Sequence, residues 1–140
     1  MVAYSFKERF VAPIQDNVKH QTIRAPRKGR SRHARAGDDL QLYTAMRTKY
    51  CTLIGRSICI DVSDIRLSLS DAMAWITEQD GGLTTIYRCG MDEFARNDGF
   101  SGFDDMRQFW VVQHPGITVF DGVLIRWGGF MTGRMETTNG

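Results

Sequence analysis

The sequence predicts a mainly β (α+β) domain in which the strands form a barrel decorated by two or three short helices. Many runs alternate apolar and polar residues or are rich in β-branched residues, turns separate them, and helical periodicity is confined to a few short segments. Strands and helices do not alternate as they do in a parallel α/β sheet. One domain is expected at residues 1–130, followed by a flexible tail at 131–140.

Strand signals are spread over the chain, and helical signals are few. Alternating or β-branched runs predict strands within residues 1–10, 19–24, 40–43, 51–62, 65–69, 83–87 and 119–127. Helical signals predict a turn around Pro13 that ends at Asn17, a short helix at 91–95 and a longer helix at 103–112. Residues 71–76 fit a strand or a helix, and residues 25–39 predict a mobile basic loop.

Apolar side chains in the predicted strands define a candidate core. The aliphatic residues expected to face the barrel interior are Ile54, Ile58, Ile60, Val123 and Ile125. Cys51 and Cys59 are expected to be small buried residues. The aromatic residues expected in the core are Trp75, Phe109 and Trp110.

Composition excludes several classes of protein. Apolar residues make up 42% and charged residues 24%, which is typical of a globular chain rather than a disordered one. No apolar run approaches the roughly 20 residues that cross a bilayer. Residues 1–10 are too polar for a signal peptide, so a cytoplasmic protein without membrane contact is expected. The three scattered cysteines and three scattered histidines argue against a disulfide framework or a metal site, and no motif indicates a cofactor.

The charge is distributed unevenly along the chain. Residues 1–35 contain nine Lys or Arg and two acidic residues, whereas residues 36–140 contain nine and fourteen. Two interpretations of this basic first quarter remain open. It is either an anion-binding surface or a solvated basic loop that has no ligand.

Residues 10–24 contain the most informative motif. Ile14 is followed by Asn17 and then by Lys19-His20-Gln21-Thr22-Ile23-Arg24, which enters a predicted strand. Here the chain resembles ASCH domains of the PUA-like superfamily. Their signature is an apolar residue, a tight turn usually made by Gly, and Lys-x-x-Thr-x-Arg entering a strand. Asn17 stands where the family usually has Gly, and Asn tolerates the same left-handed backbone.

The resemblance to ASCH domains continues downstream and covers most of the chain. Residues 37–40 are similar to the family's Gly-Asp-x-Leu turn, and residues 94–100 are similar to its acidic-Gly-Phe segment. Residues 103–110 and 120–127 are similar to its closing helix and strand. The resemblance therefore implies a PUA-like barrel.

The resemblance also implies a candidate catalytic set. In one bacterial branch, the small acetylcytidine amidohydrolases, a Lys, a Thr and a Glu are catalytic, and the matching positions are Lys19, Thr22 and the shorter Asp98. A lysine beside a carboxylate in a partly dry pocket activates a hydroxyl, so Thr22 would be the nucleophile. Arg24 would polarise a carbonyl or hold a phosphate. The shorter carboxylate weakens this hypothesis, because small displacements of catalytic groups reduce rates strongly.

Strand geometry sets a condition for this site. Thr22 and Arg24 are two residues apart and share a strand face, whereas Lys19 has the opposite parity. Lys19 reaches the same cleft only if the chain bends between Asn17 and Gln21. If the site is catalytic, replacing Lys19 or Thr22 by Ala is expected to remove hydrolysis of an acylated cytidine while folding is retained. If the site only binds, the same changes are expected to weaken ligand affinity, with no turnover.

The favoured hypothesis is an RNA- or nucleotide-binding module whose ligand is RNA, single-stranded DNA or a nucleoside-like molecule. Its contact residues are expected to be Arg24, Arg27, Lys28, Arg30, Arg32, Arg35, Tyr43 and Arg47. One alternative is an amidohydrolase acting on acylated cytidine, or a ribonuclease, that uses Lys19, Thr22 and Asp98. Another is a phage or mobile-element protein that binds or blocks a host nucleic-acid complex.

These residues also fit structural roles. Lys19 and Arg24 fit solvated strand-edge charges, and Thr22 fits an ordinary strand residue. Convergence of Lys19, Thr22 and Asp98 within hydrogen-bond reach would favour catalysis, whereas charges spread over an open surface would favour binding.

Overall fold

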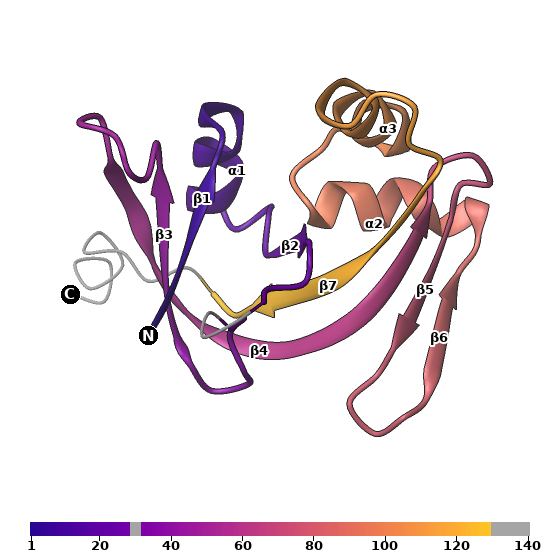
Figure 1. The fold of residues 1–140 in the computed structure, drawn as a ribbon, viewed down its shortest axis with the longest axis horizontal. Helices are drawn as coiled ribbons and strands as arrows, with labels where there is room; N and C mark the ends of the chain where they lie inside the picture. The colour runs from indigo at the N-terminus through magenta and orange to yellow at the C-terminus, as the bar shows by residue number, and fades with distance from the viewer. Residues whose placement is uncertain (29–31, 130–140) are drawn as a thin grey trace.

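Strand β4 (Thr52–Ser68) is the longest element, and it joins the two halves of a seven-stranded mixed sheet (Figure 1). The computed structural model describes residues 1–28 and 32–129. The first part of β4 pairs antiparallel with β3 (Asp39–Thr44), which lies parallel to β1 (Val2–Phe6). β-Branched residues along β4 favour the extended backbone, and register shifts in its ladders add local bends.

The second part of β4 is paired on both edges. It lies antiparallel to β5 (Met73–Thr77) on one edge and to β7 (Val119–Trp127) on the other. The chain turns at Gly81 from β5 into β6 (Leu83–Ile86). Strand β2 (Gln21–Arg24) pairs with the free side of β7, so this ladder anchors two of the candidate site residues.

A long crossover connects β1 to its parallel neighbour β3, as parallel pairing requires. It contains a 3-10 turn (Glu8–Phe10), helix α1 (Val11–Gln15), strand β2 and the basic segment, which we define as residues 24–35. Pro13 lies within α1, where it is tolerated because the first N–H groups of a helix have no partner inside it. The crossover therefore carries the whole Lys-x-x-Thr-x-Arg motif onto β7.

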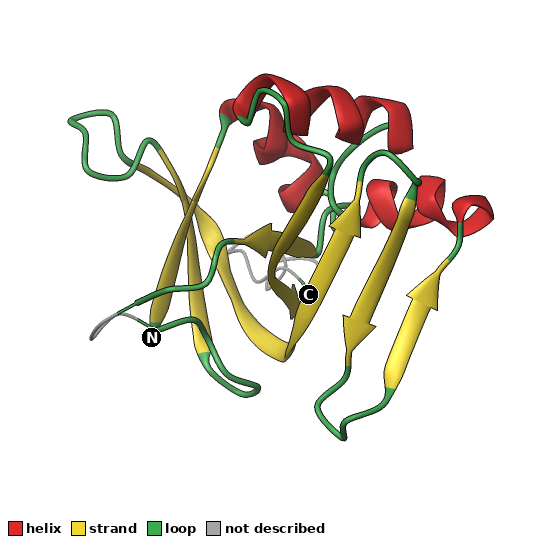
Figure 2. Ribbon diagram, turned by 45° about the vertical axis from the view of Figure 1, so that its right-hand side comes forward, coloured by secondary structure: helices red, strands yellow, loops and turns green. Residues whose placement is uncertain are grey.

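The helices lie on the concave side of the curved sheet, where α1 is joined by α2 (Met91–Asn97) and α3 (Phe103–Gln113) (Figures 1 and 2). Helix α3 buries Met106 and Trp110, which are four residues apart and therefore share one helix face. None of the helices in the described part of the chain is long and apolar enough to cross a membrane.

The strands form a mainly β, mixed sheet, but the barrel closure expected from the sequence is not found. Within residues 1–28 and 32–129, no ladder pairs β1 with β2 or with β6. Arginine side chains face the outer edge of β1 instead. Arg24 Nη2 donates to Ser5 O at 2.7 Å, and Arg27 Nη2 donates to Ala3 O at 3.3 Å. These guanidinium groups occupy carbonyls that a neighbouring strand would need for closure.

Most predicted elements are confirmed, and most of their ends shift by one or two residues. The strand predicted within residues 1–10 is shorter, because β1 ends at Phe6 and a 3-10 turn follows at Glu8–Phe10. The strands predicted at 51–62 and 65–69 are one continuous strand, because the intervening Ser63 and Asp64 keep the buried–exposed alternation. The ambiguous residues 71–76 lie mostly in β5. Asn17 has the left-handed backbone that its position predicts, with φ 61°.

The core prediction is confirmed at Ile54 and Ile125, which are 7% and 0% exposed. It is wrong at Ile58 and Ile60, which are 39% and 57% exposed. In this part of β4 the buried positions are odd-numbered, as at Cys59. The even-numbered Ile58 and Ile60 therefore face outward.

The remaining core predictions have mixed outcomes. Cys59 is buried, whereas Cys51 is exposed because it precedes the paired part of β4. Trp110 is buried, and the residues that are only half-buried are Trp75, Phe109 and Val123. The predicted tail at 131–140 and the predicted contact residue Arg30 lie outside the described residues.

Candidate functional site

Lys19 and Asp98 form a buried ion pair inside the curved sheet. Their exposed fractions are 2% and 4%. Lys19 Nζ donates to Asp98 O at 2.6 Å, to Gln21 O at 2.9 Å and to Asp98 Oδ1 at 3.2 Å. An ammonium group has three N–H donors, so these three acceptors saturate a charged lysine. Nothing in this arrangement requires Lys19 to act as a base.

The surroundings of the pair are apolar. Lys19 Nζ lies 4.6 Å from the ring centroid of Phe10 and 5.5 Å from that of Phe6, both within cation–π range. Burial lowers the pKa of Lys19 from its ordinary value, and the Asp98 carboxylate opposes this effect. Burial likewise raises the pKa of Asp98, and Lys19 opposes that effect. Each charge therefore depends on the other for its stability.

A left-handed bend brings Lys19 into this position. Asn17 has φ 61°, and the backbone N–H groups of Val18 and Lys19 both donate to Pro13 O at 2.9 Å. The strand begins only at Gln21, so the regular alternation that would exclude Lys19 from the Thr22 face does not extend back to it. The predicted bend between Asn17 and Gln21 is therefore present.

The C-terminal end of α2 presents Asp98. Gly99 has φ 93° and donates its N–H to Arg96 O, while Phe100 donates to Ala95 O, which is a Schellman-type helix end. The N–H of His20 donates to Asn97 O at 3.0 Å and fixes this helix end against the start of β2. The acidic residue at the helix end is thereby held against the basic motif.

Thr22 and Arg24 share one face of β2, as the sequence predicts. Arg24 Nε donates to Thr22 Oγ1 at 3.1 Å. The Arg24 guanidinium carbon also lies 4.7 Å from the ring centroid of Phe6. Thr22 is 5% exposed and keeps its hydroxyl hydrogen as a donor, because Oγ1 acts only as an acceptor toward Arg24.

These four residues line one cavity of about 240 Å³. Its polar lining includes Lys19, Thr22, Arg24 and Asp98. Five aromatic side chains line the same cavity: Phe6, Phe10, Phe100, Phe109 and Trp110. Phe10, Phe100 and Phe109 pack on one another with centroid distances of 5.3–5.5 Å. The combination of flat apolar walls and a few fixed polar groups is typical of a small-molecule site.

The hydrogen bonds inside the cavity leave groups for a ligand. In the described chain, Lys19 is bonded to Asp98, and Thr22 is bonded to Arg24, but no bond joins the two pairs. Lys19 engages only the Oδ1 atom of Asp98, so Oδ2 remains an acceptor. The cavity thus offers an acceptor at Asp98 and donors at Thr22 and Arg24.

Three further polar side chains, which the sequence did not indicate, also line the cavity: Lys7, Gln113 and His114. The His114 ring stacks on Trp110 with a centroid distance of 5.4 Å. Lys7 directly precedes the Glu8–Phe10 turn. The only feature of the sequence that could have indicated Lys7 as a site residue is its place near the start of the crossover that carries the motif.

The described basic residues of the predicted loop make several internal contacts. Arg27 Nη1 donates to Arg32 O at 2.9 Å, and Arg32 Nη1 donates to Asp38 Oδ2 at 3.0 Å. Residues 25–28 and 32–38 are therefore held by internal contacts. Lys28 and Arg35 are exposed, and no side-chain contact engages them within the described residues.

A histidine that the sequence analysis did not use holds the basic segment to β1. His33 Nε2 donates to Ala25 O at 2.7 Å, since a carbonyl oxygen only accepts, so Nδ1 accepts from the Tyr4 hydroxyl at 3.0 Å. The Ala34 N–H in turn donates to the Tyr4 oxygen at 3.1 Å. Burial lowers the pKa of His33, which favours this neutral form.

Two predicted contact residues lie away from the cavity. Tyr43 is half-buried on β3 and donates its hydroxyl to Gln41 Oε1 at 2.9 Å. Arg47 lies in the turn between β3 and β4, with φ 68°. The structure therefore brings Lys19, Thr22, Arg24 and Asp98 together and leaves Tyr43 and Arg47 outside that group.

Among the described residues, no group of three or more His, Cys, Asp or Glu is arranged to hold a metal ion. Comparison of the chain with protein-family models, with curated proteins and with solved structures finds no match.

Proposed function

We propose that the cavity binds one base or nucleoside unit of RNA, single-stranded DNA or a nucleotide-like ligand. The observation that carries this proposal is that the Lys19–Asp98 pair, Thr22 and Arg24 line the same cavity as five aromatic side chains. Aromatic rings stack bases of any sequence, and fixed donors and acceptors select an edge. The cavity volume of about 240 Å³ lies below the roughly 300–1,000 Å³ of pockets that bury drug-sized ligands, so the cavity suits one such small unit.

A ligand that fits these polar side chains has a hydrogen-bond donor beside an acceptor on one edge of its ring. Asp98 Oδ2 would accept an N–H of the ligand, while Thr22 Oγ1 and Arg24 would donate to a ring nitrogen or a carbonyl oxygen. Pyrimidine bases present such edges. The proposal includes membership of the ASCH class of the PUA-like superfamily, which the motif of residues 14–24 favours.

Binding is favoured over hydrolysis by the hydrogen bonds of Lys19. All three of its N–H donors are engaged, and they hold Asp98 and the backbone rather than the Thr22 hydroxyl. A nucleophilic threonine needs a base within hydrogen-bond reach of its proton. We therefore place amidohydrolase activity second.

The test uses the full chain with cytidine, N4-acetylcytidine and a fluorescein-labelled single-stranded RNA octamer. Thr22→Val keeps the side-chain shape but removes the donor, and is expected to weaken all three affinities by about three- to tenfold. The matched control is Thr84→Val on the exposed part of β6, which should leave the affinities unchanged. Absence of binding to all three ligands by the wild-type chain would refute the proposal.

The same experiment separates the two functions. Acetate release from N4-acetylcytidine should stay at the background rate for the wild-type chain. Turnover that is lost in Thr22→Val would replace the binding proposal with the amidohydrolase. The chemistry of that reaction would be amide hydrolysis by water, with acetate and cytidine as products.

The basic segment would supply the phosphate contacts. Binding of the RNA octamer is expected to weaken steeply with salt, because phosphate contacts release counterions. Reversal of Lys28 and Arg35 to Glu tests this without breaking the contacts made by Arg27 and Arg32. Arg88→Glu, in the exposed turn before α2, is the control of equal charge change for each position. Equal effects of all the reversals would show that only net charge matters.

A further inference from the structure

A basic groove lies on the outer edge of β1, separate from the cavity. Its volume is about 410 Å³, and it is lined by residues 1–3, by Met46 and by Arg27, Arg32 and Arg47. Within the described residues, no acidic side chain lines it. We call this hollow the arginine groove. Three guanidinium groups around one concave surface suit an anion with several oxygen acceptors.

Internal contacts fix two of these arginines but leave donors unused. Arg27 donates one N–H each from Nη1 and Nη2 to Arg32 O and Ala3 O, and its guanidinium carbon lies 4.8 Å from the Tyr4 ring centroid. A guanidinium has five N–H donors, so three of them have no acceptor among the described residues. Arg32 uses Nη1 for His33 O and Asp38 Oδ2, and its Nε and Nη2 have no acceptor in the described part of the chain. The groups are positioned before any ligand arrives.

A strained turn supplies the third arginine. Ala45 and Arg47 both have left-handed backbone conformations, with φ 53° and 68°. The Met46 N–H donates to Ser5 Oγ at 3.4 Å, so the turn is attached to β1. A left-handed backbone is unfavourable for a residue with a Cβ, and it recurs where a side chain must be directed to a particular place. Here it places Arg47 at the groove.

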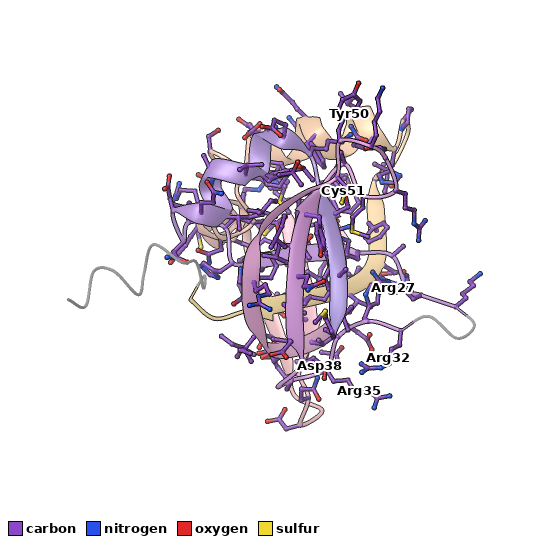
Figure 3. The ribbon with its side chains drawn as sticks, turned by 90° about the vertical axis from the view of Figure 1, so that its left-hand side faces the viewer. Arg27, Arg32, Arg35, Asp38, Tyr50 and Cys51 are labelled. Atoms are coloured by element: carbon purple, nitrogen blue, oxygen red, sulfur yellow. The ribbon has the colours of Figure 1, made fainter. Side chains whose placement is uncertain are left out.

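The groove and the cavity follow each other along β1. Arg24, from the cavity wall, binds Ser5 O, and Arg27, from the groove, binds Ala3 O. Two residues of a strand span about 6.8 Å. Figure 3 shows Arg27 beside the β1 ribbon, with Arg32 and Arg35 further along the same side. A chain-like ligand that leaves the cavity at Arg24 therefore meets Arg27 next.

We infer that the arginine groove binds the phosphodiester backbone adjacent to the base held in the cavity. The ligand class is then a single-stranded nucleic acid rather than a free nucleoside. This inference rests on the proposed function, because it needs a base in the cavity. A duplex does not satisfy it, since its bases are stacked and paired and a single base cannot enter the cavity without leaving the duplex.

The test compares Arg47→Gly with the wild-type chain. Glycine adopts the left-handed backbone without strain, so this variant should fold at least as stably as the wild type. Ala45→Gly changes the same turn without loss of charge, and Lys49→Ala removes a charge from it outside the groove. The ligands are cytidine, labelled RNA and DNA octamers, and labelled polyglutamate of similar length.

Arg47→Gly is expected to weaken binding of the RNA or DNA octamer by about tenfold and to reduce its salt slope by about one. Its affinity for cytidine should be unchanged, because Arg47 does not line the cavity. The two control variants should match the wild type with every ligand. A difference in affinity between the RNA octamer and the DNA octamer would identify which nucleic acid is preferred, and either preference supports the inference.

Three results would overturn the inference. An octamer that binds no more tightly than cytidine leaves base binding in the cavity intact but contradicts phosphodiester binding by the groove. Equal loss in Arg47→Gly and Lys49→Ala reduces the effect to net charge. Polyglutamate that binds as tightly, with the same dependence on Arg47, replaces the phosphodiester by another polyanion. Failure of the proposed function is distinct, because cytidine itself would then not bind.

Discussion

Gly99 approaches Lys19 so closely that a Cβ on Gly99 would lie 2.8 Å from Lys19 Cδ. Gly99 also has φ 93°, which disfavours any other residue. The glycine therefore has two separate roles. It ends helix α2 after Asp98, and it leaves the space through which the lysine stem reaches the ion pair.

Gly99→Ala should destabilise the protein more than the same change at a glycine with equal backbone strain. Gly37 has the same φ of 93°, and nothing lies within 4 Å of a Cβ there. We expect Gly37→Ala to cost about 1–2 kcal/mol from strain alone, and Gly99→Ala to exceed this because Lys19 must also move. Urea denaturation of both variants measures the difference. Equal losses would mean that the contact with Lys19 is unimportant.

The Lys19–Asp98 pair should be costly to break from one side. Lys19→Met leaves an unpaired buried carboxylate, and we expect a loss of about 3–5 kcal/mol in the free energy of unfolding. Adding Asp98→Asn should recover part of this loss, since the buried charge is removed. Urea denaturation of the single and double variants gives the coupling. The same reasoning predicts that Lys19→Ala also lowers the free energy of unfolding, in contrast to the retained folding expected from the sequence. A double variant no more stable than Lys19→Met would contradict this account.

Strand β7 should depend on Ile125 for its anchorage. Ile125 is fully buried, and truncation of such a residue to Ala typically costs about 2–5 kcal/mol. Ile60→Ala is the matched control, because Ile60 is 57% exposed, and we expect a change within about 0.5 kcal/mol. Thermal unfolding followed by circular dichroism tests both. A similar shift in Tm for the two variants would contradict the placement of β7.

Stability should fall as the pH drops below about 6.5. The pKa of His33 in the folded chain lies below its ordinary value of 6.5, mainly because of burial, and Arg24 and Arg27 add to the effect. The unfolded chain therefore binds the proton more readily, so the His33 contribution is complete above 6.5 and is lost as the pH falls through the folded-state pKa. His33→Gln should flatten this part of the stability–pH curve. A slope that is unchanged in His33→Gln would assign it to another group.

The motif predicted much of the site because it combines local rules. Asn17 tolerates a left-handed backbone, and the parity of Thr22 and Arg24 places them on one face whatever their partners are. The pairing of Lys19 with Asp98 follows from no local rule, since the two residues lie 79 positions apart in the sequence. The resemblance to ASCH domains predicted that Lys19 and Asp98 share a site. In the structure, the end of α2 lies against the start of β2 and brings the two residues together.

Other features were beyond local patterns. Ile58 and Ile60 are of a residue type that is common in cores, but they are exposed. Which alternate residues of β4 are buried depends on the face of the strand that other elements cover. The barrel was inferred from strand number, whereas closure depends on which edges meet. The arginines at 27 and 32 were recognised as charges, but their backbone partners are set by the tertiary structure.

The guanidinium groups of Arg24 and Arg27 have a consequence for self-association. A strand with free carbonyls invites a second molecule to add its own strand, which is a common first step in aggregation. On β1 the carbonyls of Ala3 and Ser5 are already engaged by bulky, charged side chains. We expect this edge to resist intermolecular pairing at high protein concentration.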